Sequence, residues 1–207
     1  MSADAQRGVT GAIVAGGANE RFGGEPKGLR TVGGTRIIDR VASAIRTVTP
    51  EIVLVANAPD AEHWLDGVPV HRDVRAERGS VVGLHTALAS IPADHVALVV
   101  AWDMPFVSAR LLSLLTTRVR EGARAAIPQS PAGPEPFCAA YTAACLADIE
   151  RAIARGDFRM SAIVAALPGV SLVSDADVRR FGDPARLFFN VNTAADLATA
   201  ERMAASD

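Results

Sequence analysis

A glycine-rich segment that carries basic residues follows the first apolar run of the chain. It reads AGGANERFGGEPKG over residues 15–28. Paired glycines let backbone N–H groups approach a triphosphate without obstruction by side chains, and Arg21 and Lys27 add positive charge. The spacing is neither G-x-G-x-x-G nor G-x-x-x-x-G-K-S/T, so neither the dinucleotide fingerprint nor the P-loop explains it. The segment predicts a triphosphate cradle, with a flexible strand-to-helix connection as the alternative.

A carboxylate follows the third apolar run. Asp103 lies in the turn Trp102-Asp103-Met104-Pro105, directly after Val96–Ala101. A hard carboxylate suits Mg²⁺, which bridges triphosphate oxygens while keeping several water ligands. Asp103 is therefore a candidate metal ligand. The alternative is that it caps the helical pattern that contains Leu111.

Other polar and glycine residues lie near the ends of apolar runs. Asn57 ends the second run, where its amide could hydrogen-bond a base or ribose, or cap a turn. Asp73 could accept hydrogen bonds from the N–H groups of a nucleotide base, or be a solvated loop carboxylate. Gly79 and Gly83 could expose backbone amides to a ligand, or could permit tight packing of a helix.

Two asparagines precede the last helical pattern. Thr193-Ala194-Ala195-Asp196 resembles a capping box and predicts the start of a C-terminal helix. Asn190 and Asn192 then lie in the preceding strand or loop. In a strand they would face the same side and could jointly hold a polar or phosphate edge, and helix capping is the alternative. The four histidines lack the spacing of metal ligands.

The elements that must position these residues indicate an α/β fold. Short runs rich in β-branched residues predict strands buried on both faces of a parallel sheet, and apolar residues at helical spacing alternate with them. Ligands of such sheets bind at the carboxyl ends of the strands, so the motifs should converge on one rim. The predicted strands are Val9–Ala15, Ile52–Ala56, Val96–Ala101, Ala125–Pro128 and Phe137–Tyr141. The predicted helices lie near Ile37–Val48, Leu84–Ile91, Leu111–Val119, Leu146–Ile153, Met160–Leu167 and after Thr193.

Composition limits the classes of protein. With 207 residues, of which 49% are hydrophobic, the chain is expected to form one domain with a large core. A formal net charge of -2 provides no basic field for nucleic acid. No apolar run is long enough for a bilayer and no signal peptide is apparent, so we expect a cytoplasmic protein without membrane partners. Cys138 and Cys145 are expected to be reduced core thiols.

Several motifs together resemble a known family. V-A-G-G, R-F-G-G and K-G-L in the first loop are similar to the signature of sugar-nucleotide-type nucleotidyltransferases. Within that superfamily, the ordered motifs of molybdenum cofactor guanylyltransferases resemble Asp73, Gly79–Leu84, Asp103–Phe106 and Asn190–Thr193. The resemblance covers nearly the whole chain. It implies a Rossmann-like three-layer nucleotidyltransferase fold with a mostly parallel central sheet.

The resemblance also implies a division of labour within one domain over residues 1–207. The N-terminal half, about 8–107, is expected to bind the nucleotide, and the C-terminal half, about 108–203, the acceptor. The implied reaction transfers GMP from GTP to the phosphate of molybdopterin, with Mg²⁺ as cofactor. The segment GDFRMS at 156–161 resembles one that contacts the pterin, and Arg159 is its phosphate partner.

The site residues implied by the resemblance are catalytic, metal-binding, nucleotide-binding or acceptor-binding. The catalytic residues are Arg21, Lys27 and Asp103, of which Asp103 is also the metal ligand. The nucleotide-binding residues are Ala15, Gly16, Gly17, Lys27, Asn57, Asp73, Gly83 and Asp103. The acceptor-binding residues are Arg159, Asn190 and Asn192. A monomer or small homo-oligomer is expected, with transient contacts to proteins that supply molybdopterin or mature molybdoenzymes.

Two residues depart from the family pattern. Pro26 stands where the family usually has the Asp of a D-K pair, and Ser80 replaces a usual Pro. Without that Asp, Lys27 or a nearby arginine loses a partner, and Glu25 is the expected substitute. The alternatives to the guanylyl reaction are a nucleotidyltransferase that uses CTP or another phosphate acceptor, and a nucleotide-binding regulatory homologue with impaired catalysis.

Overall fold

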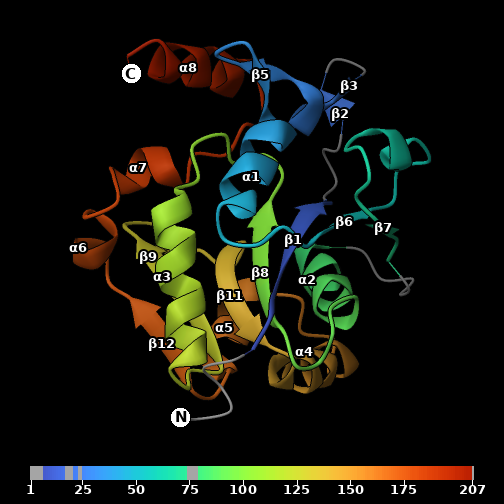
Figure 1. Cartoon of the computed structure of the whole chain (residues 1–207). Coiled ribbons are helices and arrows are strands. Elements are labelled where there is room, and N and C mark those ends of the chain that lie inside the picture. The colour runs from blue at the N-terminus through green and yellow to red at the C-terminus, as the bar shows by residue number, and fades with distance from the viewer. Residues whose placement is uncertain (1–6, 17–20, 23–24, 74–78, 207) are drawn as a thin grey trace.

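The computed structural model describes residues 7–16, 21–22, 25–73 and 79–206, and its largest element is a mixed sheet of eight strands. Seven of them are ordered β10-β9-β11-β8-β1-β6-β7, and β12 pairs with β9 (Figure 1). The strands are β1 (Val9–Ala15), β6 (Ile52–Ala56), β7 (Val70–His71), β8 (Val96–Ala101), β9 (Ala125–Ser130), β10 (Gly133–Pro134), β11 (Cys138–Thr142) and β12 (Val170–Val173).

Parallel pairing dominates the part of the sheet that the first half of the chain builds. Strand β1 lies between β6 and β8 and is parallel to both, and β6 is parallel to β7. In the second half, β11 runs antiparallel to β8 and β9, whereas β12 is parallel to β9. The expected mostly parallel central sheet is confirmed.

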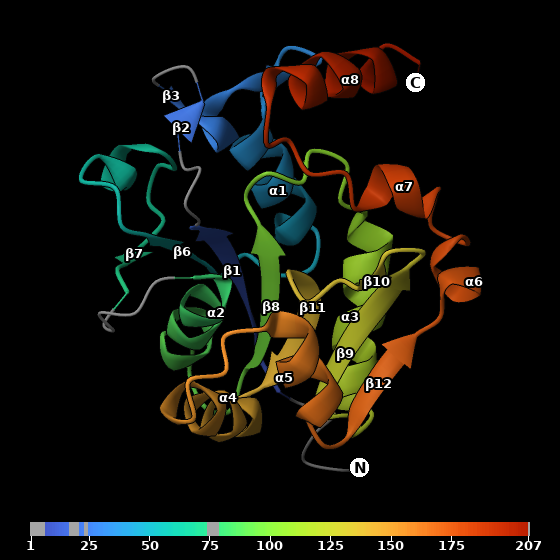
Figure 2. The same ribbon diagram turned by 180° about the vertical axis from the view of Figure 1, so that it is seen from behind.

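Helices cover both faces of the sheet and make three layers. Helices α1 and α3 pack on one face, and α2, α4 and α5 pack on the other (Figures 1 and 2). Their bounds are α1 (Ile37–Arg46), α2 (Ser80–Ala89), α3 (Ala109–Arg120), α4 (Ala144–Ala154) and α5 (Met160–Ala166). The three-layer α/β fold expected from the sequence is therefore present.

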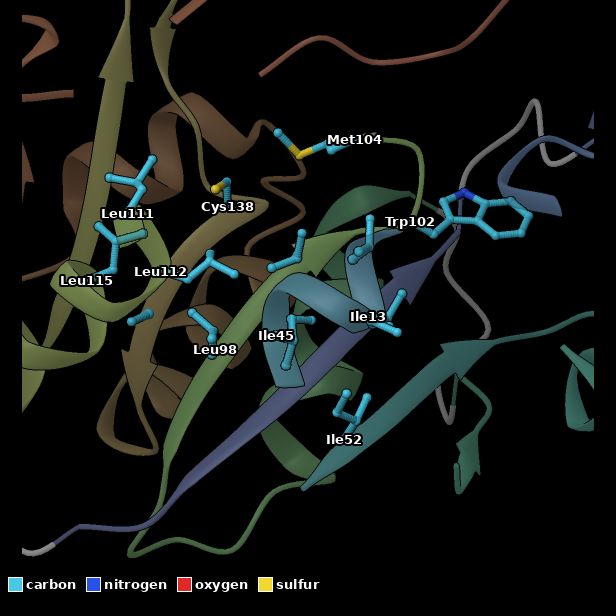
Figure 3. Packing of buried hydrophobic residues seen from close by; sticks show 14 of the residues in the cluster. Ile13, Ile45, Ile52, Leu98, Trp102, Met104, Leu111, Leu112, Leu115 and Cys138 are labelled. Carbon is cyan, nitrogen blue, oxygen red and sulfur yellow. The ribbon is translucent and has the colours of Figure 1, made fainter. Parts of the chain in front are cut away.

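Side chains of the central strands alternate between two hydrophobic clusters. Ile13 of β1 and Leu98 of β8 belong to the cluster beneath α1 and α3, where Ile45 and Leu112 meet them (Figure 3). Val14, next to Ile13 in β1, belongs to the cluster beneath α2, α4 and α5. Because both faces are buried, every position of such a strand must be apolar or small. This explains the continuous apolar runs in the sequence.

The long strands of the first half have the predicted bounds, whereas α2 begins at Ser80, four residues before the predicted Leu84, and ends at Ala89, before Ile91. β1, β6 and β8 begin and end at the predicted residues. Strand β11 lies one residue later than predicted, and β9 continues two residues past Pro128. The sequence did not indicate β12, whose Leu172 is 50% exposed, nor the short helices α6 (Asp175–Val178) and α7 (Pro184–Leu187). Elements of four residues contain too few repeats for a periodic signal.

A third hydrophobic cluster joins the C-terminal segment to the first half of the chain. The hairpin of β4 (Thr31–Val32) and β5 (Thr35–Arg36) lies beneath helix α8 (Ala194–Ala204). Val32 in the hairpin, Val191 and Ala200 pack in this cluster. The remaining short elements are the hairpin β2 (Arg21–Phe22) with β3 (Glu25–Pro26) and the 3₁₀ helices η2 (Lys27–Leu29) and η3 (Ala61–His63).

Both cysteines are free and buried in the core, as expected. Burial raises the pKa of each thiol, and the cysteines lie in different clusters, Cys138 of β11 in the one beneath α1 and α3, and Cys145 of α4 in the one on the other face. Within the described ranges, no helix combines the length and apolar character that crossing a bilayer requires.

Thiol titration tests this burial. We expect neither Cys138 nor Cys145 to react with an aromatic disulfide reagent at pH 8 in the native protein, because burial disfavours the reactive thiolate. Both should react once the chain is unfolded in urea. A native thiol that reacts as fast as free cysteine would contradict the packing described here.

Candidate functional site

The carboxyl ends of β1, β6 and β8 lie together at one edge of the sheet. Ala15 at the end of β1 is in register with Ala56 at the end of β6, and Val14 is in register with Ala101 of β8. Asn57 and Asp103 therefore emerge at the same edge as Gly16, which begins the first loop. The rim predicted from the sequence is confirmed.

The centre of this rim is a buried ion pair between Lys27 and Asp103. The Lys27 ammonium donates to Asp103 Oδ2 at 2.5 Å and to Asn192 Oδ1 at 2.8 Å. The side chains of Lys27 and Asp103 are only 8% and 10% exposed. Charges with so little water around them require partners, and this lysine of the first loop has two, a carboxylate and an amide oxygen.

Asn192 reaches this pair because its backbone is held at both ends. The amide of Val191 donates to the carbonyl of Asp103 at 2.9 Å, and Val191 is buried in the third hydrophobic cluster. On the other side, Thr193 and Asp196 form the predicted capping box of α8, which is confirmed. Residues 189–193 form a loop. Within it, the Asn190 side chain donates to the carbonyl of Phe188 at 2.9 Å. The two asparagines thus have different partners.

The capping alternative for Asp103 is wrong. Helix α3 begins at Ala109, and the hydroxyl of Ser108 caps it by accepting from the amide of Leu111. Asp103 lies five residues before Ser108, in the turn that follows β8. Its carboxylate is therefore available to the rim rather than to a helix end.

A second polar group lies at the ends of β6 and β7. Asn57 and Asp73 pair through two hydrogen bonds, from the Asn57 amide to Asp73 Oδ2 at 2.7 Å and from the Asp73 backbone to Asn57 Oδ1 at 2.9 Å. The hydroxyl of Thr86, which is buried in α2, donates to Asp73 Oδ1 at 2.7 Å. The Asp73 carboxylate is thus held in a fixed orientation rather than being an ordinary solvated loop residue.

Several predicted site residues belong to the first loop, which the structure describes only in part. Ala15 is buried at the end of β1, and Gly16 is exposed. Gly17 lies outside the described residues, as do the side chains of Arg21 and Glu25, so the role expected of Glu25 stays a prediction. Lys27 nevertheless has Asp103 as its carboxylate partner, although Pro26 replaces the usual Asp.

Gly83 is a packing position in the described structure. It lies in the first turn of α2, and a Cβ at this residue would be 2.9 Å from Cγ1 of Val14 in β1. Its amide points to the carbonyl of Gly79 at 3.5 Å. Gly79 precedes the helix with φ of +135°, a conformation that favours glycine. The close approach of α2 to β1 accounts for Gly83.

Arg159 is exposed and makes local contacts with Asp157. Its side chain is 80% exposed, and its Nε is 3.4 Å from Asp157 Oδ1. The backbone N–H of Arg159 donates to the same carboxylate, which lowers the pKa of Asp157. No hydrogen bond between described residues joins Arg159 to Lys27, so its acceptor-binding role stays a prediction.

Sequence reasoning missed two contributors to the rim. Thr86 is a polar residue within an apolar helical pattern, and that contrast was the available signal for a buried hydroxyl with a partner. Trp102 stacks on Trp64, with ring centroids 5.0 Å apart and planes at 16°. Its ring leaves no room for a side chain at residue 28, where a Cβ would be 2.4 Å from the indole. No sequence spacing indicated this contact.

The described residues contain no group of three or more His, Cys, Asp or Glu side chains that could hold a metal ion. Mg²⁺ in nucleotide sites is commonly held by one or two carboxylates together with substrate phosphates and water. Asp103 is a buried carboxylate whose Oδ2 bonds Lys27. It fits a Mg²⁺ site in which the protein provides one carboxylate.

Comparison with known proteins gives one family. The model of the MobA-like NTP transferase domain matches residues 11–170. A molybdenum cofactor guanylyltransferase from Desulfosudis oleivorans is 34% identical over 194 residues, which are 93% of this chain and 94% of the relative. One from Nitrobacter hamburgensis is 30% identical over 203 residues, or 95% of both chains.

A solved structure shares the fold over almost the entire chain. It is molybdopterin-guanine dinucleotide biosynthesis protein A from Archaeoglobus fulgidus, with a TM-score of 0.78 and 27% identity. The similarity covers 96% of this chain and 100% of that one. The first half of our chain, which carries the rim, and the second half, which carries α8, are therefore both matched.

Removal of Lys27 tests the energetic role of the buried pair. We expect Lys27→Met to lower the free energy of unfolding by about 3 kcal/mol, because it leaves the Asp103 carboxylate buried without a cation. Adding Asp103→Asn should recover part of this loss. Urea unfolding measures both, and Arg36→Met, which breaks an exposed pair with Asp39, is the control with an expected loss of at most about 1 kcal/mol. Equal losses at both sites would contradict the burial.

Proposed function

Because the chain belongs to the MobA-like NTP transferase family, we propose that it transfers GMP from GTP to the phosphate of molybdopterin, forming molybdopterin guanine dinucleotide and pyrophosphate. The observation that carries the proposal is the buried ion pair of Lys27 and Asp103 just after β8, in which Lys27 also bonds the exposed Asn192. It puts a cation and a carboxylate where a triphosphate lying on the first loop needs them.

The width of the rim fits a nucleotide. Asp73 follows β7 and Asp103 follows β8, and these strands are three positions apart in the sheet order β8-β1-β6-β7. Three interstrand spacings are about 14 Å. A nucleotide laid across the strand ends thus has its triphosphate over β1 and β8 and its base over β6 and β7.

The reaction needs no covalent enzyme intermediate. The acceptor phosphate is already an anionic nucleophile, and one of its oxygens attacks the α-phosphorus of GTP. The bond from that phosphorus to the bridging oxygen of the β-phosphate breaks, and pyrophosphate leaves with the electron pair. The protein therefore has to align the two phosphates and neutralise the charge that develops on the leaving group.

Lys27 is proposed to neutralise the charge that develops on the leaving pyrophosphate, and it is a cation whose side chain the structure describes. An ammonium has three donors, and those of Lys27 that bond Asp103 and Asn192 fix its position. The third donor is assigned to the triphosphate in this proposal, and Arg21 adds a second cation from the first loop. A lysine held by two partners loses little freedom when substrate binds, so its charge is preorganised.

Asp103 is the proposed ligand of Mg²⁺. Oδ2 bonds Lys27, and Oδ1 is the oxygen assigned to the cation. A divalent cation bound there supplies further positive charge to the triphosphate. Because the same carboxylate would contact both Mg²⁺ and the Lys27 ammonium, Asp103 links the proposed cation position to Lys27.

Asp73 is the proposed contact to the base. Each of its oxygens accepts one hydrogen bond from the protein and retains a second lone pair. Guanine presents two neighbouring donors, N1–H and the 2-amino group, which match the two oxygens. Cytosine presents one amino donor beside an acceptor, so this carboxylate favours GTP over CTP. Arg159, Asn190 and the C-terminal half are assigned to the molybdopterin phosphate and pterin.

Turnover tests the reaction itself. Purified protein with Mg²⁺, α-labelled GTP and molybdopterin should give labelled dinucleotide, and α-labelled CTP should give far less. Asp103→Ala should abolish the product, because it removes the carboxylate that holds Lys27 and the cation. Failure to form the dinucleotide from either nucleotide would reject the proposal and favour a regulatory nucleotide-binding role. Preference for CTP would reject only the choice of base.

Base recognition can be tested separately through Thr86. Thr86→Val keeps the shape of the side chain but removes the donor to Asp73 Oδ1. We expect KM for GTP to rise about fivefold with little change in KM for molybdopterin, because a net hydrogen bond contributes about 1 kcal/mol. Thr116→Val is the matched control, since Thr116 is equally buried but donates to Ser113 within α3. Equal effects of the two variants would contradict a positioning role for Thr86.

A further inference from the structure

Trp102 has a buried donor without an acceptor. Its side chain is among the largest that are fully buried, and its residue is 1% exposed. Nε1 has no hydrogen-bond partner among the described residues. In Figure 3 the indole extends past the end of β1, and its nitrogen lies on the edge of the ring that faces away from the strands. A buried N–H with no acceptor is uncommon and costs free energy, so this one requires an explanation.

The neighbouring tryptophan provides an internal comparison. Trp64 stacks on Trp102 at 5.0 Å, and its own Nε1 donates to Asp60 Oδ2 at 3.2 Å. The two indoles thus share one environment, but only one of them has a protein acceptor. Burial in an aromatic stack alone does not explain why the other N–H lacks one.

Trp102 lies in the part of the rim that is proposed to hold the triphosphate. Its backbone amide donates to the carbonyl of Val14 at the end of β1, at 3.2 Å. The next residue is Asp103, whose carboxylate bonds Lys27, and the indole lies directly against Gly28. The indole therefore belongs to the residue before Asp103 and contacts Gly28, the residue after Lys27.

We propose that Trp102 is a nucleotide-binding residue whose Nε1–H donates a hydrogen bond to a phosphate oxygen of the bound triphosphate. This inference rests on the proposed function. A phosphate oxygen is the acceptor that the site would bring to this position, because Trp102 directly precedes Asp103 and its indole contacts the residue after Lys27, whereas the Asn57 and Asp73 group lies at β6 and β7. The indole is a neutral donor, so it adds orientation without adding charge.

Nuclear magnetic resonance of the indole N–H groups tests the contact directly. The chain has two tryptophans, so a ¹⁵N-labelled sample gives two indole signals, which Trp64→Phe and Trp102→Phe assign. We expect GTP with Mg²⁺ to move the Trp102 signal downfield and to slow its exchange with water. Inorganic tripolyphosphate with Mg²⁺ should do the same, and guanosine should not. The Trp64 signal, which already has Asp60 as acceptor, should change little.

Affinity gives a second measurement. Trp102→Phe keeps an aromatic ring to stack on Trp64 but removes the donor, and we expect it to weaken GTP binding about tenfold, as for a hydrogen bond to a charged acceptor. Trp64→Phe is the matched control and should weaken binding far less. Circular dichroism and the urea midpoint of each variant establish that it folds, and the indole signal of the wild-type protein does not depend on either variant's stability.

The outcomes separate this inference from the proposed function. If calorimetry shows GTP binding but the Trp102 signal stays unchanged, or if Trp102→Phe binds GTP like wild type, the phosphate contact is wrong and the guanylyl reaction still stands. A shift produced equally by guanosine would also overturn the assignment to phosphate. If no nucleotide binds and no dinucleotide forms, the proposed function and this inference both fail.

Discussion

The buried pair of Lys27 and Asp103 is the interaction on which the rest of the site depends. Two charges removed from water are tolerated only when they are close to one another and when their remaining hydrogen-bonding groups are satisfied. Here the partners come from three distant parts of the chain, because Asn192 also bonds Lys27. The first loop, the end of β8 and the segment before α8 must therefore take up one mutual arrangement. The same arrangement fixes the positions of the Lys27 ammonium and the Asp103 carboxylate at the edge of the sheet.

The two polar groups of the rim are built according to one physical rule. Each has a carboxylate shortly after a strand, Asp103 after the buried β8 and Asp73 after the partly buried β7, and each contains a charged side chain that a residue from another element orients. Asn192 orients Lys27, and Thr86 orients Asp73 from within α2. The strands themselves are fixed by two hydrophobic clusters, one on each face of the sheet. Rigid strands combined with oriented side chains give a surface that needs little rearrangement to meet a polyphosphate.

The sequence predicted those parts of the molecule that local pattern determines. β1, β6 and β8 had the predicted bounds because strands buried on both faces leave a continuous apolar run. Partnerships could not be predicted in this way, because Lys27 is 76 residues from Asp103 and 165 from Asn192. Sequence reasoning considered a carboxylate beside Lys27, at Glu25, as its partner. The structure pairs Lys27 with Asp103, which follows β8, the neighbour of β1 in the sheet, and the role of Glu25 stays a prediction.

The docking of α8 has a consequence for biogenesis. Val191 and Ala200 join Val32 in a cluster that holds Asn192 against Lys27. All the strands of the sheet precede this segment, so the sheet can form on the ribosome while Lys27 and Asp103 still lack their third partner. The nascent chain would then acquire its complete polar centre only after α8 leaves the exit tunnel and docks.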